Sequence, residues 1–530
     1  MKKTTFIILF FLVCNLTFSQ EHAWVYFKDK PDEATFLANP LTMLTQKALD
    51  RRGKQNISLD SKDIPIAEMY ETTIRNANGI QVKAKSKWLN ALHILGSETD
   101  IKALSNLSFV KSVDFAANDL NAKSVLKKQH KFDIQTEFNY GGSFNQIEML
   151  KGEVLHQKGF TGEGMTIAVM DGGFPGVNTL SAFQRMRDNN QIKGGYDYVQ
   201  RNANFYTGFS HGTSVLSTMA GFVDEKLVGT APDADYYLFI TEKGATETPL
   251  EESLWVEAAE KADSLGVDVI NTSLGYNTFD DSRYNYTYAD MNGKTTFITR
   301  GADIAFSRGM IVVNSAGNEG DKTWRYITAP GDGFNVLTIG AVYGNESIVA
   351  FSSFGPSADG RTKPDVLAKG GATTIINRTG NVTTGNGTSF SSPVICGVIA
   401  CFWQANPTKT NAEIIKAIKE SGHLYANPTS QEGYGIPDFE KAITTLTVDE
   451  LFFDTFKVYP NPFQDKLQFY FANISDEIEV SIYDVLGRKV LIQQLNQQQS
   501  EINTEFLSQG IYLVQIKQDG NSKTFTVLKR

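Results

Sequence analysis

The chain has 530 residues, a formal net charge of −9 and 41% hydrophobic residues. The hydrophobic content excludes an intrinsically disordered chain, and the acidic balance argues against nucleic acid as a partner, because phosphate binding needs a basic face. At about 100 to 200 residues per domain, the length predicts two to four folded units.

The N-terminus has the pattern of a secretory signal peptide. Lys2 and Lys3 form a basic start, residues 6–13 are an apolar core, and small or polar residues follow near Ser19. This core is too short to anchor the chain in a membrane, and no long apolar span follows it. We therefore expect a signal peptide over residues 1–20 and export from the cytoplasm.

The next section, residues 21–120, alternates strand-like runs such as HAWVYFKD with helical patterns such as TDIKALSNL. This alternation predicts a small α+β domain. The stretch that follows, residues 121–146, is rich in Lys, Gln and Asn and predicts an exposed linker or processing region.

From residue 147 to residue 446 the pattern changes to strand, loop and helix in alternation. MTIAVMD, VDVINTSLG and GMIVVNSAGN are apolar runs that end in Asp, Gly or Asn, and helical patterns such as SLWVEAAEKADSLG separate them. Continuous apolar strands between helices predict an α/β domain whose parallel sheet is covered on both faces. In such sheets the ligand lies beyond the carboxyl ends of the strands.

The last section, residues 447–530, contains only strand and turn patterns. Apolar and polar residues alternate in EVSIYDVLGRKVL and in GIYLVQIKQDGNSKTFTVL. This pattern predicts a small antiparallel β-sandwich.

Three polar residues in the α/β section stand at strand ends or helix starts. Asp171 ends the strand IAVMDGG, His211 opens the helix SHGTSVLSTMAG, and Ser389 opens the helix in GNGTSFSSPVICG. A serine becomes a nucleophile when an imidazole takes its proton and a carboxylate orients that imidazole. His156 and His423 also lie in this section, but His211 is the best placed base. Helix capping is the alternative role for Ser389.

A fourth residue, Asn318, lies in the Gly-rich turn of VVNSAGNEG. Its amide, together with the backbone N–H of Ser389 at a helix start, could bind the negative oxygen of an attacked carbonyl. The sequence therefore predicts an oxyanion site beside the serine.

These motifs in this order resemble the subtilisin-like serine peptidases (subtilases, peptidase family S8) over about residues 147–446. The resemblance implies a three-layer αβα fold with a mostly parallel sheet. It also implies that an extended substrate pairs with a strand edge. The implied roles are Asp171, His211 and Ser389 as the catalytic triad, Asn318 in the oxyanion hole, and Ser273, Leu274 and Gly275 as the substrate-binding edge.

The implied function is that of a secreted serine endopeptidase, which hydrolyses polypeptide substrates through an acyl-enzyme. The alternative from another class is a catalytically inactive, surface-exposed binding protein that keeps the subtilase fold, and a third possibility is an esterase or peptide ligase. No cofactor is required; calcium is frequent in the family, but the sequence shows no ligand cluster to which a metal site can be assigned.

The chain departs from the family pattern in three places. Gly172 stands where a hydroxyl residue usually follows the triad aspartate, Ser214 stands where a second histidine is usual, and residues 368–370 are Ala-Lys-Gly instead of Ala-Pro-Gly. None of these positions is a triad residue, so they bear on efficiency more than on reaction type.

The two flanking sections resemble known accessory domains. Residues 21–120 resemble the subtilase propeptide, which implies a zymogen inhibited by its own N-terminal domain; an unrelated accessory domain is the alternative. YPNP at 459–462, YDVLGRKV at 483–490 and GIYLVQI at 510–516 resemble the sorting domain of the type IX (Por) secretion system of Bacteroidetes. The alternative there is a carbohydrate-binding or spacer sandwich. The resemblance implies a secreted or cell-surface protein that engages the type IX machinery.

Overall fold

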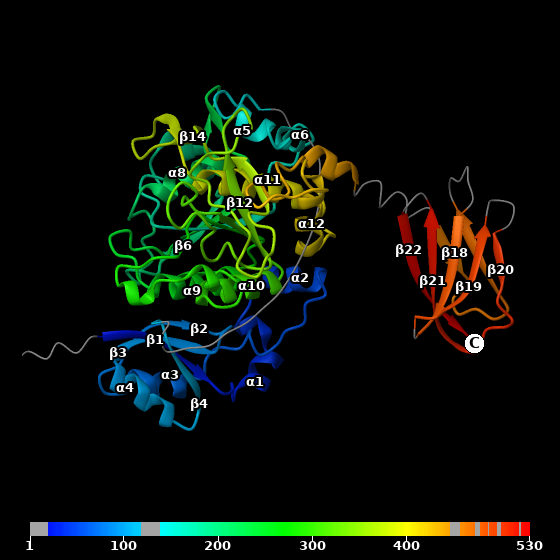
Figure 1. Cartoon of the computed structure of the whole chain (residues 1–530), viewed down its shortest axis with the longest axis horizontal. Helices are drawn as coiled ribbons and strands as arrows, with labels where there is room; N and C mark the ends of the chain where they lie inside the picture. The colour runs from blue at the N-terminus through cyan, green and yellow to red at the C-terminus, as the bar shows by residue number, and fades with distance from the viewer. Residues whose placement is uncertain are drawn as a thin grey trace, which may run out of the picture. The chain divides into compact units, whose positions relative to one another are not determined.

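The computed structural model describes residues 20–117, 138–445, 456–471, 478–485, 487–495, 500–518 and 521–530. The chain divides into two compact units, Met1–Ala442 and Ile443–Arg530 (Figure 1). Residues 1–19 of the predicted signal peptide, residues 118–120 at the end of the predicted N-terminal domain and residues 121–137 of the predicted linker lie outside the described residues, while Gln20 is the first residue of β1.

The N-terminal part of the first unit is an α+β domain, as predicted. Its antiparallel sheet has the strand order β2-β3-β1-β4 and buries Val25, Leu92 and Ile94. The elements are β1 (Gln20–Phe27), β2 (Gln81–Ser86), β3 (Ala91–Ser97), β4 (Val110–Phe115), α1 (Glu33–Ala38), α2 (Gln46–Lys54), α3 (Glu68–Arg75) and α4 (Glu98–Ala103).

The rest of the first unit is built on a seven-stranded parallel sheet in the order β13-β12-β11-β10-β5-β9-β6, so the predicted α/β fold is confirmed. All residues of β5 are buried, as expected for a strand covered on both faces. The strands are β5 (Thr166–Asp171), β6 (Ile192–Asp197), β9 (Asp235–Ile240), β10 (Val269–Thr272), β11 (Ile311–Ser315), β12 (Val336–Val342) and β13 (Val366–Lys369).

Helices cover both faces of this sheet and make the three layers (Figure 1). On one face α11 packs on β10 to β13 and on α8; on the other α9 packs beside α10. The helices are α5 (Phe144–Glu148), α6 (Gly152–His156), α7 (Gln184–Asp188), α8 (His211–Ala220), α9 (Leu250–Leu265), α10 (Phe297–Ser307), α11 (Thr388–Gln404) and α12 (Asn411–Ser421), and two hairpins join β7 (Phe222–Val223) to β8 (Leu227–Val228) and β14 (Thr373–Ile376) to β15 (Val382–Gly385).

The end of the predicted linker 121–146 is not an exposed linker in this structure. Ser143 and Gln146 are fully buried: the Ser143 hydroxyl donates to the carbonyl of Val228 at 3.0 Å, and the Gln146 amide donates to the carbonyl of Thr374 at 3.2 Å. These polar side chains satisfy backbone groups of two hairpins, which explains why a polar sequence is buried here.

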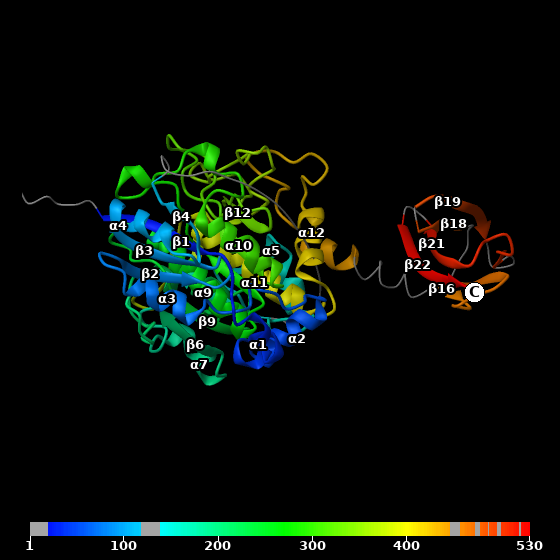
Figure 2. The same cartoon turned by 90° about the horizontal axis from the view of Figure 1, so that it is seen from below.

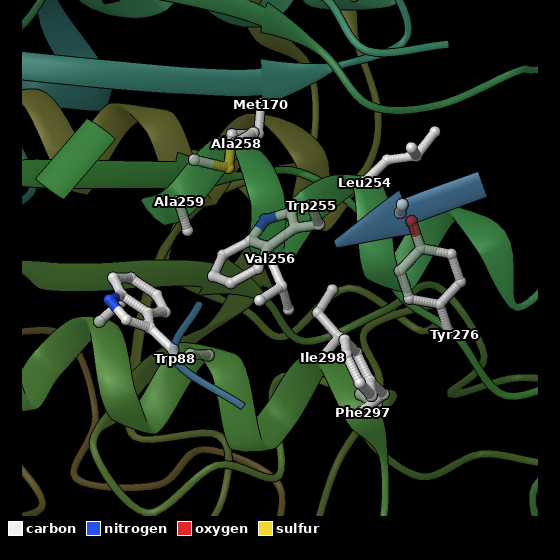
Figure 3. Packing of buried hydrophobic residues seen from close by; sticks show 14 of the residues in the cluster. Trp88, Met170, Leu254, Trp255, Val256, Ala258, Ala259, Tyr276, Phe297 and Ile298 are labelled. Atoms are coloured by element: carbon white, nitrogen blue, oxygen red, sulfur yellow. The ribbon is translucent and has the colours of Figure 1, made fainter. Parts of the chain in front are cut away.

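The N-terminal domain covers α9 (Figures 1 and 2). Trp88 of that domain belongs to the same buried cluster as Trp255 and Ala259 of α9 and Met170 of β5 (Figure 3). The shared apolar cluster makes the N-terminal domain and the α/β domain one packed body.

Buried polar contacts reinforce this interface. The Glu260 carboxylate on α9 accepts hydrogen bonds from the backbone N–H groups of Lys87 at 2.9 Å and Trp88 at 3.0 Å. Asp263, one turn further along α9, pairs with the buried guanidinium groups of Arg51 and Arg52. A buried carboxylate is costly unless it is paired, so both acids depend on the N-terminal domain for their partners.

The second unit is a β-sandwich, as predicted. One sheet has the order β16-β17-β20 and the other β19-β18-β21-β22; all pairs are antiparallel and the sheets share one core around Phe469, Ile482 and Val514. The strands are β16 (Phe456–Tyr459), β17 (Lys466–Phe471), β18 (Ile478–Asp484), β19 (Lys489–Leu495), β20 (Glu501–Asn503), β21 (Gly510–Gln518) and β22 (Asn521–Lys529).

None of the described helices combines the length and apolar character that a membrane crossing requires.

Candidate active site

Asp171 and His211 meet at the carboxyl end of β5. Asp171 is the last residue of that strand, and His211 is the first residue of α8. His211 Nδ1 lies 2.9 Å from each carboxylate oxygen of Asp171, while the backbone N–H of Gly172 donates to Asp171 Oδ1 at 2.7 Å. The Asp171 side chain is 1% exposed and that of His211 is 40% exposed. A buried acid thus orients an imidazole whose outer edge faces solvent.

The electrostatics of this pair suit a general base. The Asp171 carboxylate raises the pKa of His211 above its ordinary value of 6.5, although burial opposes that rise. Because Nδ1–H donates to the carboxylate, Nε2 of the neutral ring is left as the proton acceptor.

Ser389 lies beside this pair, at the start of α11. It is the second residue of the helix, and the ring of the next residue, Phe390, has its centroid 6.1 Å from that of His211. The Ser389 hydroxyl donates to the carbonyl of Ser273 at 3.4 Å. Ser389 is thus next in the chain to a residue that lies against His211, while its hydroxyl is turned toward Ser273; among the described residues no hydrogen bond joins His211 to Ser389. Catalytic hydrogen bonds are often long or unformed without substrate.

Pro393 is the sixth residue of α11, which begins at Thr388, so it lies beyond the first turn of the helix. A proline at this position removes the N–H that would bond the carbonyl of Ser389, four residues earlier. The Ser273 hydroxyl donates to that carbonyl instead, at 2.9 Å. Pro393 thus leaves an acceptor free, by which the serine segment is fixed to the segment after β10.

Asn318 lies close to the Ser389 backbone. Its Oδ1 accepts hydrogen bonds from Thr388 N at 2.9 Å and Thr388 Oγ1 at 3.0 Å, while Thr388 Oγ1 itself accepts from the N–H of Gly317 at 3.2 Å. Since Oδ1 faces two donors, Nδ2 points away from Thr388.

Gly387, the residue before α11, shows where Asn318 Nδ2 is directed. Its φ is +150°, and a Cβ placed on it would lie 3.7 Å from Asn318 Nδ2 and 3.6 Å from Ser389 N. Two N–H donors therefore flank one small space, which a side chain at position 387 would enter. An oxyanion is stabilised by this kind of arrangement.

The predicted substrate edge, Ser273 to Gly275, follows β10 and lies outside the strand, which ends at Thr272. Its polar groups are partly in use: the Leu274 carbonyl accepts from Asn314 Nδ2 at 3.4 Å and from Ser315 Oγ at 3.3 Å. Gly275 is exposed. The segment therefore lies beside Ser389 as expected, with one of its carbonyls directed inward.

Several residues of the site were not found by sequence reasoning. Thr388 holds the Asn318 amide, and the chain Ser392 Oγ to Asn271 Oδ1 at 3.1 Å and Asn271 Nδ2 to Ser273 Oγ at 3.2 Å joins α11 to β10. The position of Thr388 directly before the serine was the available signal. Asn271 and Ser392 carry no local signal, because their contact depends on the order of the strands.

The other two histidines of this domain have structural contacts. His156 is fully buried, Nε2 lies 3.0 Å from the carbonyl of Thr230, and burial lowers its pKa to about 4. His423 Nδ1 accepts the backbone N–H of Ile436 at 3.1 Å. The contacts of His156 and His423 leave His211 as the histidine with a carboxylate partner at the sheet edge.

Glu319, beside Asn318, forms an ion pair with Lys322 at 2.8 Å.

The predicted departures from the family pattern are accommodated locally. Ser214 donates to the carbonyl of Ile376 at 2.9 Å, and the carbonyl of Gly370 accepts the N–H of Gly387 at 2.9 Å, so both serve backbone groups. Among the described residues, no cluster of three or more His, Cys, Asp or Glu side chains is suited to hold a metal ion. Cys396 and Cys401 are buried and unpaired thiols.

Comparison with protein-family models gives a match to the subtilase family over residues 162–436, the stretch that contains the whole cluster around Ser389. The chain belongs to the subtilase family. Subtilases are serine endopeptidases, so this protein is a serine-type endopeptidase related to the subtilisins.

Characterised subtilases are similar to the chain over more than half of its length. Subtilisin NAT of Bacillus subtilis subsp. natto is 29% identical over 347 residues, which cover 63% of this chain and 81% of that protein. Subtilisin of Bacillus pumilus is 29% identical over 304 residues, which cover 56% of this chain and 97% of that protein. Among solved structures, MycP1 with its N-terminal propeptide removed matches with a TM-score of 0.44 and 22% identity, over 57% of this chain and 95% of that one.

The regions on either side of the subtilase domain match family models of their own. Residues 22–132 match the peptidase S8 propeptide domain of Bacteroidota, and residues 457–530 match the secretion system C-terminal sorting domain. The subtilase is therefore made with a propeptide domain and a type IX sorting domain, which indicates export to the cell surface or the medium.

Proposed function

We propose that the protein is a secreted endopeptidase that cleaves polypeptides through a Ser389 acyl-enzyme. His211 accepts the proton of Ser389 as the hydroxyl oxygen attacks the scissile carbonyl carbon, and Asp171 stabilises the imidazolium that forms. The observation that carries the proposal is the contact of His211 Nδ1 with both oxygens of the buried Asp171, beside the helix whose second residue is Ser389.

The tetrahedral intermediate places a negative oxygen beside the serine. The amide of Asn318 and the N–H of Ser389 donate to this oxygen, since both flank the small space next to Gly387. The intermediate collapses when His211 gives its proton to the leaving amine. Water then attacks the ester, with the same imidazole as base, and releases the acid product and free Ser389.

We further propose that the N-terminal domain keeps the enzyme inactive until it is removed, and that the signal peptide and the sorting domain bring the chain across both membranes. The buried contacts of Glu260 and Asp263 with the N-terminal domain support a tight intramolecular complex. No metal is assigned to the reaction.

Labelling of the processed enzyme with a fluorophosphonate tests the nucleophile. We expect labelling on Ser389, loss of labelling in Ser389→Ala, and a fall in kcat of about 10⁶-fold in that variant, the scale known for loss of the nucleophile in subtilisin. Ser347→Ala, in an exposed loop, is the matched control and keeps full activity. An open, processed protein that is never labelled belongs to the alternative class of inactive binding proteins.

A further inference from the structure

Two glycines in the segments after β10 and β11 pack against the Thr328 side chain, and one of them, Gly317, also packs against the hydroxyl of Ser353. A Cβ added to Gly275 would lie 2.0 Å from Thr328 Oγ1, and a Cβ added to Gly317 would lie 3.0 Å from it. Gly275 belongs to the segment that follows β10, and Gly317 to the segment that follows β11. The side chain of Thr328 therefore fills the space between these two segments.

The backbone on either side of Thr328 is fixed to both segments. The N–H of Thr328 donates to the carbonyl of Ala316 at 3.2 Å, and Ala329 and Tyr276 exchange two backbone hydrogen bonds, at 2.8 and 3.1 Å. Thr328 is 2% exposed. These bonds fix the backbone of Thr328 between the two segments.

The hydroxyl of Thr328 gains no hydrogen bond in this position. It is buried, and no partner for it is found among the described residues. A valine would fill the same volume without leaving a buried hydroxyl unpaired, which costs stability. Threonine at position 328 is thus not explained by the stability of the fold.

The position of a bound substrate follows from the proposed chemistry. The attacked carbon of the substrate is next to Ser389 Oγ, and Ser389 Oγ is 3.4 Å from the carbonyl oxygen of Ser273. The oxygen on the attacked carbon faces Asn318 Nδ2. The side chain on the acyl side of the scissile bond then enters between the Ser273–Gly275 segment and the Ala316–Asn318 segment. Thr328 packs against a glycine of each segment, Gly275 and Gly317, and so bounds the slot that this side chain would enter.

We propose that Thr328 closes this slot and limits the acyl-side residue of the substrate to a small side chain, namely Gly, Ala or Ser. This inference rests on the proposed function and deepens it. Because a single added carbon at Gly275 already overlaps the Thr328 hydroxyl, the inner part of the slot has no room for the ring of Phe or the branch of Leu.

Fluorogenic peptides that differ only in the acyl-side residue test the proposal with the active enzyme released from the full chain. We expect kcat/KM for Ala to exceed that for Phe by at least about 10²-fold. Thr328→Gly should raise kcat/KM for Phe at least tenfold and change that for Ala only a few-fold. Thr328→Val keeps the volume and should keep the preference for Ala, which separates size from hydrogen bonding.

Fluorophosphonate labelling is measured on every variant, so that each outcome has one meaning. An enzyme that is labelled but prefers Phe or Leu overturns the size limit and leaves the proposed function intact, whereas an enzyme that is not labelled overturns the function itself. If Thr328→Gly is not labelled because it fails to fold, Thr328→Ala takes its place. A labelled Thr328→Ala with the Phe-to-Ala ratio of the wild type also overturns the proposal.

Discussion

A histidine pair between the N-terminal domain and α9 makes stability depend on pH. His22 Nδ1 lies 2.8 Å from His93 Nε2, and His93 Nδ1 lies 2.7 Å from the hydroxyl of Ser253 on α9. Burial, helped by the charge of Lys83, lowers the pKa of His22 from 6.5 to about 4, although Glu21 acts in the opposite direction. The folded protein thus favours neutral His22, while the unfolded chain takes up a proton below pH 6.5.

We expect the His22 term in the free energy of unfolding to shrink as the pH falls from 6.5 toward 4, because the unfolded state binds more protons in that range. With these two pKa values the loss between pH 7 and pH 5 is about 2 kcal/mol. His22→Asn removes this titration but keeps a polar side chain. Between pH 7 and pH 5 the free energy of unfolding of the variant should therefore fall by about 2 kcal/mol less than that of the wild type.

Urea unfolding followed by tryptophan fluorescence measures this difference, in a Ser389→Ala background that prevents self-cleavage. The comparison between the two proteins is essential, because burial also raises the pKa of Glu260 to about 7, and that group acts in the opposite direction. Its effect is common to both proteins and cancels in the difference. A wild type and a His22→Asn variant that lose equal stability between pH 7 and pH 5 would refute the linkage.

Three other predictions concern the active site and the interface. The rate of hydrolysis should fall as the pH drops, with the midpoint of the pH–rate profile above pH 6.5, because Asp171 raises the pKa of His211 and only the neutral ring accepts a proton. Asp171→Asn should lower kcat roughly 10⁴-fold and move this midpoint to lower pH. A variant whose pH–rate profile keeps the midpoint of the wild type contradicts this role of Asp171. Asn318→Ala should lower kcat by about 10²- to 10³-fold. Because the Thr388 hydroxyl holds the Asn318 amide, Thr388→Val should cause little further loss of kcat when Asn318 is already alanine. A double variant whose loss of kcat is the product of the two single losses argues against a shared role. Glu260→Gln should lower the free energy of unfolding in urea by about 1 to 3 kcal/mol, since an amide cannot accept all the hydrogen bonds that the N-terminal domain donates to the carboxylate. A variant with an unchanged midpoint of urea unfolding excludes a role of Glu260 in holding the N-terminal domain.

The sequence predicted the layout of the fold because the patterns that encode it are local. Apolar runs such as IAVMD and VINT become strands that are buried on both faces, and alternating runs in the C-terminal section become the two sheets of a sandwich. The prediction of an exposed linker failed at Ser143 and Gln146, whose polar side chains are buried against hairpins that are distant in the sequence. Composition reports the polarity of a residue but not the partner that satisfies it.

Asp171, His211, Asn318 and Ser389 could be named as candidates from the sequence by itself, since each lies in a recognisable short motif at a strand end, at a helix start or, for Asn318, in a Gly-rich turn. Only the tertiary structure decided the residues that support them: Thr388 on the Asn318 amide, the Ser273 hydroxyl on the carbonyl freed by Pro393, and Thr328 between two glycines. These contacts join segments that become neighbours through the strand order β13-β12-β11-β10-β5-β9-β6. The physical reason is that a side chain is defined by local sequence, whereas its hydrogen-bond partners and the space around it are set by packing between distant segments.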